Sequence, residues 1–240
     1  MTSTSVERVD YTGEGLSEDE LAPTPWQQIR RWVDEADARG RNGADVPEPR
    51  ALSVATVDAS GAPNVRTVLM RFLDERGPGF VTSLDSTKGL ELAANPHIAA
   101  ALTWPAMFRA IRFRGTGEQV DRDEVATYWA SRPWGSRISA WASSQSQPAT
   151  GRAQLEADFD RYAAQFPDHG NDDDVPVPQF WGGFRIRCSE VEFWGGRRNR
   201  LHDRLVFTAV GAGGGAAAQD IDIRPGLDEA AAWVLVRRQP

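Results

Sequence analysis

Residues 192–207 have the sequence E-F-W-G-G-R-R-N-R-L-H-D-R-L-V-F, in which a glycine pair separates two strand-like ends. A glycine pair between extended segments is typical of a tight turn, so this stretch predicts a β-hairpin. After the turn, Arg200, His202 and Arg204 alternate, and on an extended chain they would point to one face. Three such side chains repel one another unless an anion lies among them. The stretch therefore predicts either an anion-binding hairpin or an arginine-rich hairpin that only faces solvent.

The composition of the whole chain fits a globular protein that binds small anions. The chain has 240 residues, which is enough for one large domain or two small ones. Hydrophobic residues make up 40% of it, which is compatible with a normal core. The net charge of −7 argues against general nucleic-acid binding, so a small anionic ligand explains the clustered arginines better. A single cysteine, Cys188, excludes an intrachain disulfide and a cysteine-based zinc site.

Several classes of site lack their sequence signatures. His97, His169 and His202 stand in unrelated contexts, so no metal site is predicted. The motif G-x-G-x-x-G after a strand, the Walker A sequence and G-x-S-x-G are all missing. No apolar run is long enough to span a bilayer, and the N-terminus has no signal-peptide core. We therefore expect a cytoplasmic protein without a membrane or nucleic-acid partner.

The rest of the pattern predicts antiparallel strands with peripheral helices. Thr24 and Pro25 are an N-cap and a first helical residue, and Gly40 closes that helix. Arg66 and Arg71 have opposite parity on one expected strand, so one of them could line an interior site while the other faces elsewhere, unless a bulge intervenes. Further helices are expected at 90–94, 121–131, after Pro133, and at 151–166. Strands are expected at 51–57, 64–73, 79–83, 97–104, 108–120, 184–193 and 231–237.

Two polar segments stand outside this pattern. Residues 1–22 include an S-E-D-E run and predict a flexible N-terminal arm, in which Arg8 and Tyr11 stand out. A single domain is expected over residues 23–240. Residues 167–178 are acidic and rich in proline, which is typical of a solvated linker.

Two groups of residues outside the hairpin have the chemistry of a phosphate site. The sequence S-T-K-G at residues 86–89 follows a strand and begins a short helix, where free backbone N–H groups and a lysine suit a phosphate. A plain capped helix is the alternative. Tyr128, Arg132 and Ser136 recur at spacings of four and offer two hydroxyls and a guanidinium to a phosphate monoester. A surface helix without a ligand is the alternative there.

Taken together, these motifs resemble those of the pyridoxine (pyridoxamine) 5′-phosphate oxidases over most of the chain. The C-terminal stretch matches the family signature of E-F-W, a short turn and R-L-H-D-R. The other motifs follow in the family's order: R-T-V-L-M-R (66–71), S-T-K-G (86–89), Y-W-A-S-R-P-W-G-S (128–136), W-A-S-S-Q-S (141–146) and F-W-G-G-F-R (180–185).

The resemblance implies an antiparallel split β-barrel that binds FMN at a homodimer interface and ends in a signature hairpin over residues 184–208. It also implies oxidation of pyridoxine or pyridoxamine 5′-phosphate to pyridoxal 5′-phosphate, with O2 as the electron acceptor and H2O2 as a product. A flavin would do the redox chemistry, so the protein would chiefly position the substrate and exclude water.

The same resemblance implies the residues of a cofactor site. Arg66 and Lys88 would meet the FMN phosphate. The other contacts with FMN would come from Thr67, Val68, Leu69, Met70, Val81, Thr82, Thr87, Gln145, Ser146, Trp194 and Arg204.

The implied substrate site has three parts. The substrate phosphate would be held by Arg71, Tyr128, Arg132 and Ser136. Arg200 and His202 are the catalytic candidates and would lie over the pyridine ring, with His202 acting in proton handling or as a structural hydrogen bonder. Arg8 and Tyr11 would close over the substrate from the N-terminal arm.

Two positions depart from the family's pattern. Arg71 stands where the family typically has lysine, which keeps the charge but changes the geometry of the donors. Ala110 stands where the family usually has a glutamine that meets the flavin, and the lost hydrogen bond is worth ~1 kcal/mol.

Two alternatives therefore stay open: a related flavin oxidase of another substrate, such as the phenazine-pathway homologues, and a non-catalytic carrier or sensor. The trio Tyr128, Arg132 and Ser136 favours a phosphorylated substrate.

Overall fold

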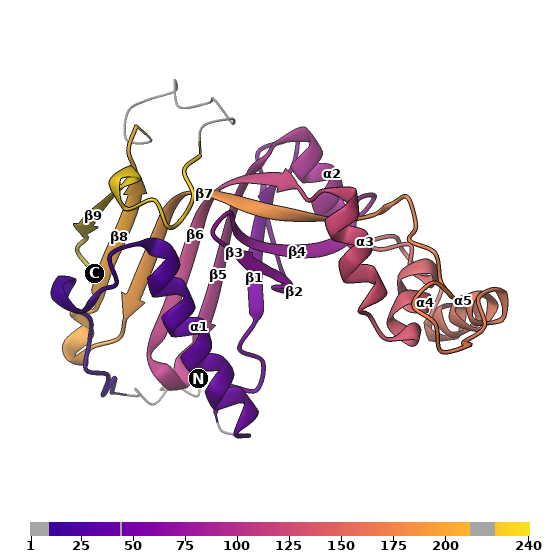
Figure 1. The fold of residues 1–240 in the computed structure, drawn as a ribbon, viewed down its shortest axis with the longest axis horizontal. Helices are drawn as coiled ribbons and strands as arrows, with labels where there is room; N and C mark the ends of the chain where they lie inside the picture. Colours follow the sequence, from indigo (N-terminus) through magenta and orange to yellow (C-terminus); the bar gives the residue numbers. More distant parts are fainter. Residues whose placement is uncertain (1–9, 44, 212–223) are drawn as a thin grey trace, which may run out of the picture.

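The computed structural model describes residues 10–43, 45–211 and 224–240. The nine strands in these ranges form one antiparallel sheet in the order β2-β1-β5-β6-β7-β4-β3, with β8 paired to β7 and β9 paired to β8. Figure 1 shows this sheet curled into a half-barrel, as the sequence predicts. The strands are β1 (Ala51–Val57), β2 (Pro63–Leu69), β3 (Phe72–Asp74), β4 (Gly77–Ser83), β5 (His97–Trp104), β6 (Arg109–Gln119), β7 (Trp181–Gly195), β8 (Asp203–Ala209) and β9 (Trp233–Arg237).

The described ranges also contain five α-helices. They are α1 (Pro25–Arg41), α2 (Thr87–Ala94), α3 (Arg122–Ala130), α4 (Trp134–Ala142) and α5 (Arg152–Gln165). Of these, α4 and α5 lie away from the sheet (Figure 1). Helix α1 begins as predicted, because the Thr24 side chain accepts a hydrogen bond from the Gln27 N–H at 3.3 Å. Its apolar face packs on the barrel, where Trp32 meets Phe193 edge to face at 5.3 Å.

Strand β7 connects the two ends of the molecule. Its first residues pair with β4, its last pair with β8, and β6 follows it along most of its length. A register shift between Arg114 and Gly115 interrupts the β6–β7 ladder. Gly115 is required there, because a Cβ atom would lie 1.9 Å from the Arg187 carbonyl oxygen. The two ends of β7 therefore belong to different parts of the fold.

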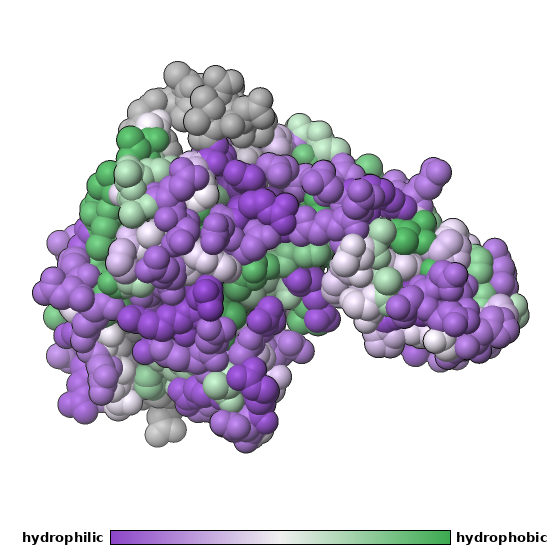
Figure 2. Space-filling model, in the orientation of Figure 1, coloured by the Kyte–Doolittle hydropathy of each residue, from purple (hydrophilic) through white to green (hydrophobic). Residues whose placement is uncertain are grey.

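The hydrophobic interior is divided in two. The larger cluster fills the barrel beneath α1, and a smaller one lies within residues 120–181, here called the helical lobe. Val125, Trp129 and Ile138 form the center of the smaller cluster and are almost fully buried. Figures 1 and 2 show the lobe standing to one side of the barrel, with a hollow between them. The lobe and the barrel are thus joined mainly by the start of β7 and by contacts across this seam.

The expected strand over residues 64–73 is wrong at its center. β2 ends at Leu69, and β3 begins at Phe72. The Met70 N–H donates to the Arg50 carbonyl at 2.9 Å, whereas the Arg71 N–H donates to the Gly79 carbonyl at 2.8 Å. The chain therefore leaves its partner β1 and joins β4 at this point. Strand parity does not carry across such a switch, so it does not decide the relative orientation of Arg66 and Arg71.

Two polar segments are less solvated than their sequences indicate. Leu16 belongs to the barrel core with 4% of its surface exposed, and its N–H donates to Asp203 Oδ2 at 2.8 Å. In the expected linker, Val175 is buried, and its carbonyl accepts the indole N–H of Trp129 at 2.8 Å. Tryptophan donors thus satisfy backbone groups that would otherwise need water. The division into an arm and a single domain stays a prediction.

Candidate functional site

The first candidate cluster lies where α2 begins. Ser86 caps the helix, and the ammonium of Lys88 folds back to donate to Thr82 Oγ1 at 2.9 Å, Ser86 Oγ at 3.2 Å and Gln145 Oε1 at 2.8 Å. These three acceptors are neutral, and Lys88 is buried with 7% exposure. Burial and the nearby charge of Arg66 lower the pKa of Lys88 to about 8. A buried ammonium with this environment is stabilised by an anion.

Arg66 stands beside Lys88 and has its own counter-ion. Its Nη2 lies 3.0 Å from Glu91 Oε2, and its Nη1 donates to Thr56 Oγ1 at 2.5 Å. Thr56 in turn donates to Glu91. Hydrogen bonds from Thr56 and Asn64 and the charge of Arg66 outweigh burial and hold the pKa of Glu91 below its ordinary value. The sequence did not identify Glu91, whose only signal is its place one turn after Lys88 on the short helix.

The Q-S pair of the candidate cofactor site reaches the same helix start. Ser146 Oγ accepts the N–H of Thr87 at 3.3 Å, and Ser146 adopts a left-handed backbone with φ of 73°. The structure therefore brings together six of the candidate cofactor residues: Arg66, Thr82, Thr87, Lys88, Gln145 and Ser146. They come from β2, β4, α2 and the segment after α4, which are far apart in the sequence.

The second cluster surrounds Arg132 at the seam between lobe and barrel. A cavity of about 320 Å³ there is lined by Ser83, Arg132, Ser136, Ser139, Ala140, Ser143, Gln145 and Trp181. The Arg132 guanidinium lies over the Trp181 ring at 4.6 Å and donates to the Ser136 carbonyl at 2.8 Å. Its Nε is buried and has no hydrogen-bond partner among the residues that the structure describes.

The electrostatics of this cavity also favour an anion. Burial lowers the pKa of Arg132, Tyr128 opposes this effect, and the charge of Arg71 lowers the pKa further. Arg71 is therefore close enough to Arg132 to repel it, as expected for two cations that share one anion. Because Gln145 lines the cavity and also binds Lys88, the two cationic clusters adjoin each other.

The hairpin after β7 differs from its prediction. β7 ends at Gly195, and residues 196–202 form a connection that includes the turn η3 (Arg198–Arg200) before β8 begins at Asp203. Asn199 and Arg200 have φ values of 58° and 62°, so the chain is not extended there. The prediction that Arg200, His202 and Arg204 alternate on one strand face is therefore wrong. Of the three, only Arg204 belongs to a strand.

An aromatic cluster replaces the predicted cationic face. His202 packs on Trp194 with ring centroids 4.8 Å apart, and Tyr11 meets both rings edge to face at 5.1 and 5.9 Å. A Cβ atom on Gly196 would lie 2.7 Å from Tyr11 Cδ1, so this glycine is required by close packing and not by a tight turn. The structure thus joins Tyr11 of the expected arm to the hairpin, whereas Arg8 lies outside the described residues.

His202 is held in one tautomer. Its Nδ1 accepts a hydrogen bond from the Arg197 N–H at 3.1 Å. A nitrogen that accepts has no proton, so the neutral ring has its proton on Nε2 and donates from that atom.

Arg204 is engaged within its own chain. Its guanidinium forms a two-pronged pair with Glu192, with nitrogen–oxygen distances of 3.0 and 2.8 Å. The hydrogen bonds that Arg204 donates to Glu192 raise the pKa of Arg204. In the sheet register, Trp194 stands opposite both Arg204 and Ala110, so these three side chains project from one face.

A single chain does not bring all candidate residues together. Trp181 lines the Arg132 cavity, and Trp194 lies thirteen residues further along β7, at the other end of that strand. A strand rises about 3.3 Å per residue, so thirteen residues span up to roughly 40 Å. Figure 1 accordingly shows β8 and the helical lobe at opposite sides of the molecule. Trp194, Arg200, His202 and Arg204 therefore lie apart from the cationic clusters of their own chain.

The remaining candidates follow the barrel wall. Thr67, Val68 and Leu69 end β2, Met70 is buried just after it, and Val81 lies in β4 next to Thr82. Directly paired residues of neighbouring strands project from the same face of a sheet. From β2 through β1, β5 and β6 to β7, the paired residues are Thr67, Ser53, Ala101, Arg112 and Glu192. One sheet face thus presents Thr67 on β2 and the Trp194 group on β7, four strands and about 19 Å away.

Comparisons with known proteins give a consistent result. Residues 43–166 match the family model described as pyridoxamine 5′-phosphate oxidase, and residues 181–240 match that of the pyridoxine 5′-phosphate oxidase C-terminal dimerisation region. The chain is 43% identical over 233 residues to a pyridoxine/pyridoxamine 5′-phosphate oxidase of Kineococcus radiotolerans, and this alignment covers 97% of each protein. It is 40% identical to the Cupriavidus necator protein of the same name over the full length of both.

Solved structures support the fold. PhzG from Burkholderia lata in complex with tetrahydrophenazine-1-carboxylic acid aligns with a TM-score of 0.77 and 26% identity, covering 95% of this chain and 99% of that one. A pyridoxamine 5′-phosphate oxidase-related, FMN-binding protein from Nostoc punctiforme aligns with a TM-score of 0.64 at 16% identity, which bears on the fold alone. None of the helices that the structure describes is long and apolar enough to cross a membrane.

Proposed function

The chain belongs to the pyridoxamine 5′-phosphate oxidase family, an oxidoreductase family, and on this premise we propose the reaction that it catalyses. Pyridoxamine or pyridoxine 5′-phosphate is oxidised to pyridoxal 5′-phosphate with FMN as the cofactor. O2 accepts the electrons and H2O2 is released; with pyridoxamine 5′-phosphate, water hydrolyses the imine that forms at C4′ and the nitrogen leaves as ammonia. When bound, FMN supplies the redox chemistry by accepting a hydride from the substrate carbon C4′.

The observation that supports this proposal best is the pair of adjoining cationic clusters. The cofactor and the substrate each have one phosphate, and the chain offers two anion sites that share Gln145. Lys88 with neutral acceptors and Arg132 with an unpartnered buried Nε both fit an anion that is bound there. We assign the FMN phosphate to Arg66 and Lys88. The substrate phosphate is assigned to Arg71, Tyr128, Arg132 and Ser136.

We propose that two chains build each site. The hairpin residues lie apart from the cationic clusters of their own chain, but Thr67, which follows Arg66 on β2, shares one sheet face with the Trp194 group. On that face, Ser53 and Ala101 are small enough to let another surface approach closely. A two-fold dimer through it would place the hairpin of each copy against the cationic clusters of the other. The similarity of residues 181–240 to a dimerisation region supports this arrangement.

In the proposed site, the hairpin residues orient the substrate ring. The Arg200 guanidinium provides positive charge over the pyridine ring, and the Nε2–H of His202 donates to a ring substituent. Trp194 and Tyr11 fix the His202 ring and exclude water from that side. The phosphate-binding residues hold the other end of the substrate, so C4′ has little freedom to leave its reactive position.

A complementation experiment tests the two-chain site. Without added FMN, Arg66→Ala should disable the half of the site with the cationic clusters, and Arg200→Ala should disable the half with the hairpin. If the halves come from different chains, randomly mixed dimers of the two variants regain roughly a quarter of the wild-type sites, because half the dimers are mixed and each has one intact site. Activity after co-expression or remixing measures this recovery. No recovery in dimers shown to be mixed would place both halves in one chain.

The affinity for FMN should depend on pH through Lys88. Below the lowered pKa of about 8, Lys88 is charged before FMN binds. Above that pH the free protein has lost the proton, and binding the phosphate must take one up, so the Kd should rise by up to about tenfold per pH unit. Fluorescence titration of the flavin-free protein between about pH 7 and pH 9.5 measures this slope. Lys88→Arg keeps its charge, so its slope should vanish, and an unchanged slope would contradict the assignment.

The structural similarity to PhzG gives the second candidate function, oxidation of a bulkier reduced aromatic acid. The two readings differ in the need for a substrate phosphate. Purified protein supplied with pyridoxamine 5′-phosphate in air should form the aldehyde and H2O2 far faster than with pyridoxamine or a dihydrophenazine carboxylate. Preferential turnover of the phenazine compound would establish the alternative.

A further inference from the structure

The residues assigned to the substrate phosphate are divided between two parts of the molecule. Tyr128, Arg132 and Ser136 belong to the helical lobe, whereas Arg71 belongs to the barrel between β2 and β3. The geometry of the phosphate site therefore depends on how the lobe sits on the barrel. Arg71 and Arg132 are both cations and repel each other, so the seam needs an attraction that holds it closed in the absence of the phosphate.

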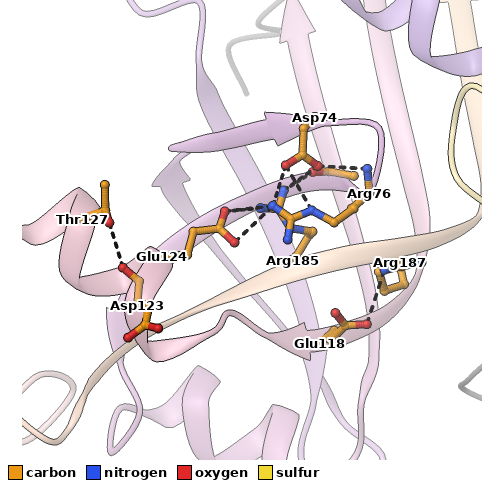
Figure 3. Close-up of polar contacts among 9 residues, drawn as sticks. Asp74, Arg76, Glu118, Asp123, Glu124, Thr127, Arg185 and Arg187 are labelled. Carbon is orange, nitrogen blue, oxygen red and sulfur yellow. Dashed lines mark hydrogen bonds and ion pairs between the residues drawn. The ribbon is translucent and has the colours of Figure 1, made fainter.

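A buried arginine supplies that attraction. Arg185 of β7 has 3% of its side chain exposed. Its Nη1 donates to Asp74 Oδ1 at 3.0 Å and to the Gly77 carbonyl at 2.9 Å, both on the β3–β4 hairpin. Its Nη2 donates to Glu124 Oε1 of α3 at 2.5 Å. Figure 3 shows this guanidinium between the two carboxylates, so that one side chain ties the barrel to the lobe.

The Arg185–Glu124 ion pair is connected to Tyr128, one of the residues assigned to the substrate phosphate. Glu124 and Tyr128 are four residues apart on α3, so they lie one above the other on the same helix face. A second route runs through Phe72, because the Arg185 guanidinium lies over its ring at 5.4 Å and the same ring meets Tyr128 edge to face at 5.7 Å. Both routes fix Tyr128, and Arg132 follows it by one turn.

The neighbouring charges are more exposed. Arg76 reaches Asp74 at 2.7 Å and Glu124 at 3.1 Å but is 48% exposed. The adjacent pair of Arg187 and Glu118 is 3.6 Å apart, with Glu118 50% exposed, and it does not touch α3. Exposed pairs of this kind contribute little to stability, whereas a buried arginine that loses one partner is strongly penalised. Arg185 is thus the member of this network on which the seam depends.

We propose that Arg185 and Glu124 are positioning residues for the substrate phosphate. Their buried ion pair fixes the lobe against the barrel and thereby sets the separation of Tyr128 and Arg132 from Arg71. The proposal rests on the function proposed above. Neither residue touches the substrate, so loss of the pair should weaken binding of the phosphate while the chemical step and the flavin site stay intact.

Glu124→Gln tests this with minimal change of shape. We expect the KM for pyridoxamine 5′-phosphate to rise roughly tenfold with kcat within about twofold of wild type, because the ligands are displaced and not removed. Flavin content and the kcat/KM for unphosphorylated pyridoxamine should not change. Asp123→Asn is the matched control, since it removes the neighbouring charge from the same turn of α3, and it should behave as wild type. An equal loss for both substrates would show a general structural role and overturn the proposal.

Two further measurements keep the test decisive. In a Tyr128→Phe background, Glu124→Gln should have a smaller effect on the KM, because part of its action passes through the Tyr128 hydroxyl, and full additivity would contradict this route. Binding of pyridoxal 5′-phosphate to the purified holoprotein should weaken by a similar factor of roughly ten in Glu124→Gln. This binding can be measured even if the wild type shows no oxidase activity. Failure of the proposed reaction and failure of the positioning role of Arg185 and Glu124 are therefore distinguishable. Unchanged binding would overturn the positioning role of Arg185 and Glu124.

Discussion

Arg200→Ala is expected to lower kcat/KM for pyridoxamine 5′-phosphate by roughly 10²- to 10³-fold, which is typical for loss of a charged group aimed at the reacting center. The flavin content should stay at the wild-type level, because Arg200 is assigned to the substrate ring and not to FMN. Steady-state kinetics together with the flavin-to-protein absorbance ratio measure both quantities.

The backbone around Arg200 supports a functional role. Asn199 and Arg200 are consecutive non-glycine residues with positive φ, a conformation that costs roughly 1–2 kcal/mol per residue. Arg200 is also exposed, so its packing does not repay this cost. Such strain is found most often where a binding site needs it. Arg198→Ala is the matched control, because it removes an exposed cation from the same turn, and it should change kcat/KM by less than about twofold.

Arg66→Ala should show the opposite pattern, with loss of bound FMN as the main effect. Removing one charge-assisted contact to a phosphate costs about 1.5–3 kcal/mol, so the Kd for FMN should rise by roughly 10- to 100-fold. The protein should then purify largely without yellow color, and added FMN should restore turnover. Arg50→Ala is the control: Arg50 also pairs with a carboxylate, that of Asp37 at 2.8 Å, and has no assigned ligand.

Arg66→Ala should also reduce stability even without flavin. Glu91 is 8% exposed and would lose its ion pair, although Thr56 and Asn64 would still donate to it. The free energy of unfolding should fall by roughly 1–3 kcal/mol in the flavin-free protein. Denaturant unfolding separates this loss from the change in FMN affinity. Equal flavin loss in Arg66→Ala and Arg200→Ala would show that the division of roles between the two arginines is wrong.

Most of the fold was predictable because helix caps and the alternation of side chains along strands are visible in short stretches of sequence. Thr24 and Ser86 cap α1 and α2 as their sequences indicate, and the alternation of β1 and β5 matches their burial. Two features had no local signal. Leu16 lies in a polar segment, and its burial depends on the distant Asp203. The break at Met70 and Arg71 arises because two different strands compete for the backbone of one segment.

The candidate site was predictable as a set of residue types but not as a geometry. The phosphate chemistry of Lys88 and Arg132 follows from their motifs, and the structure places Lys88 in a buried cationic cluster and Arg132 at the wall of a cavity. The hairpin geometry was missed because parity assumes an extended chain, whereas Asn199 and Arg200 turn it to the left-handed region. The separation of the hairpin from these clusters depends on the length of β7, which no single motif contains.

The carboxylates that pair with the arginines could not be predicted from the motifs either. Glu192 binds Arg204 and Arg112 from near the end of β7, and its acidic character there has no periodic signal. Ala110 faces the same group through its pairing with Trp194. Its small side chain adds no polar group to that face, at the position where the resemblance to the family predicts a glutamine.

Anaerobic mixing of the purified yellow protein with pyridoxamine 5′-phosphate tests the proposed reaction. The visible flavin absorbance should disappear at a rate at least as fast as turnover, and one pyridoxal 5′-phosphate should form for each flavin reduced. Admission of O2 should restore the absorbance and release H2O2 in equal amount. Flavin that stays oxidised in the presence of saturating pyridoxamine 5′-phosphate would contradict the proposed function.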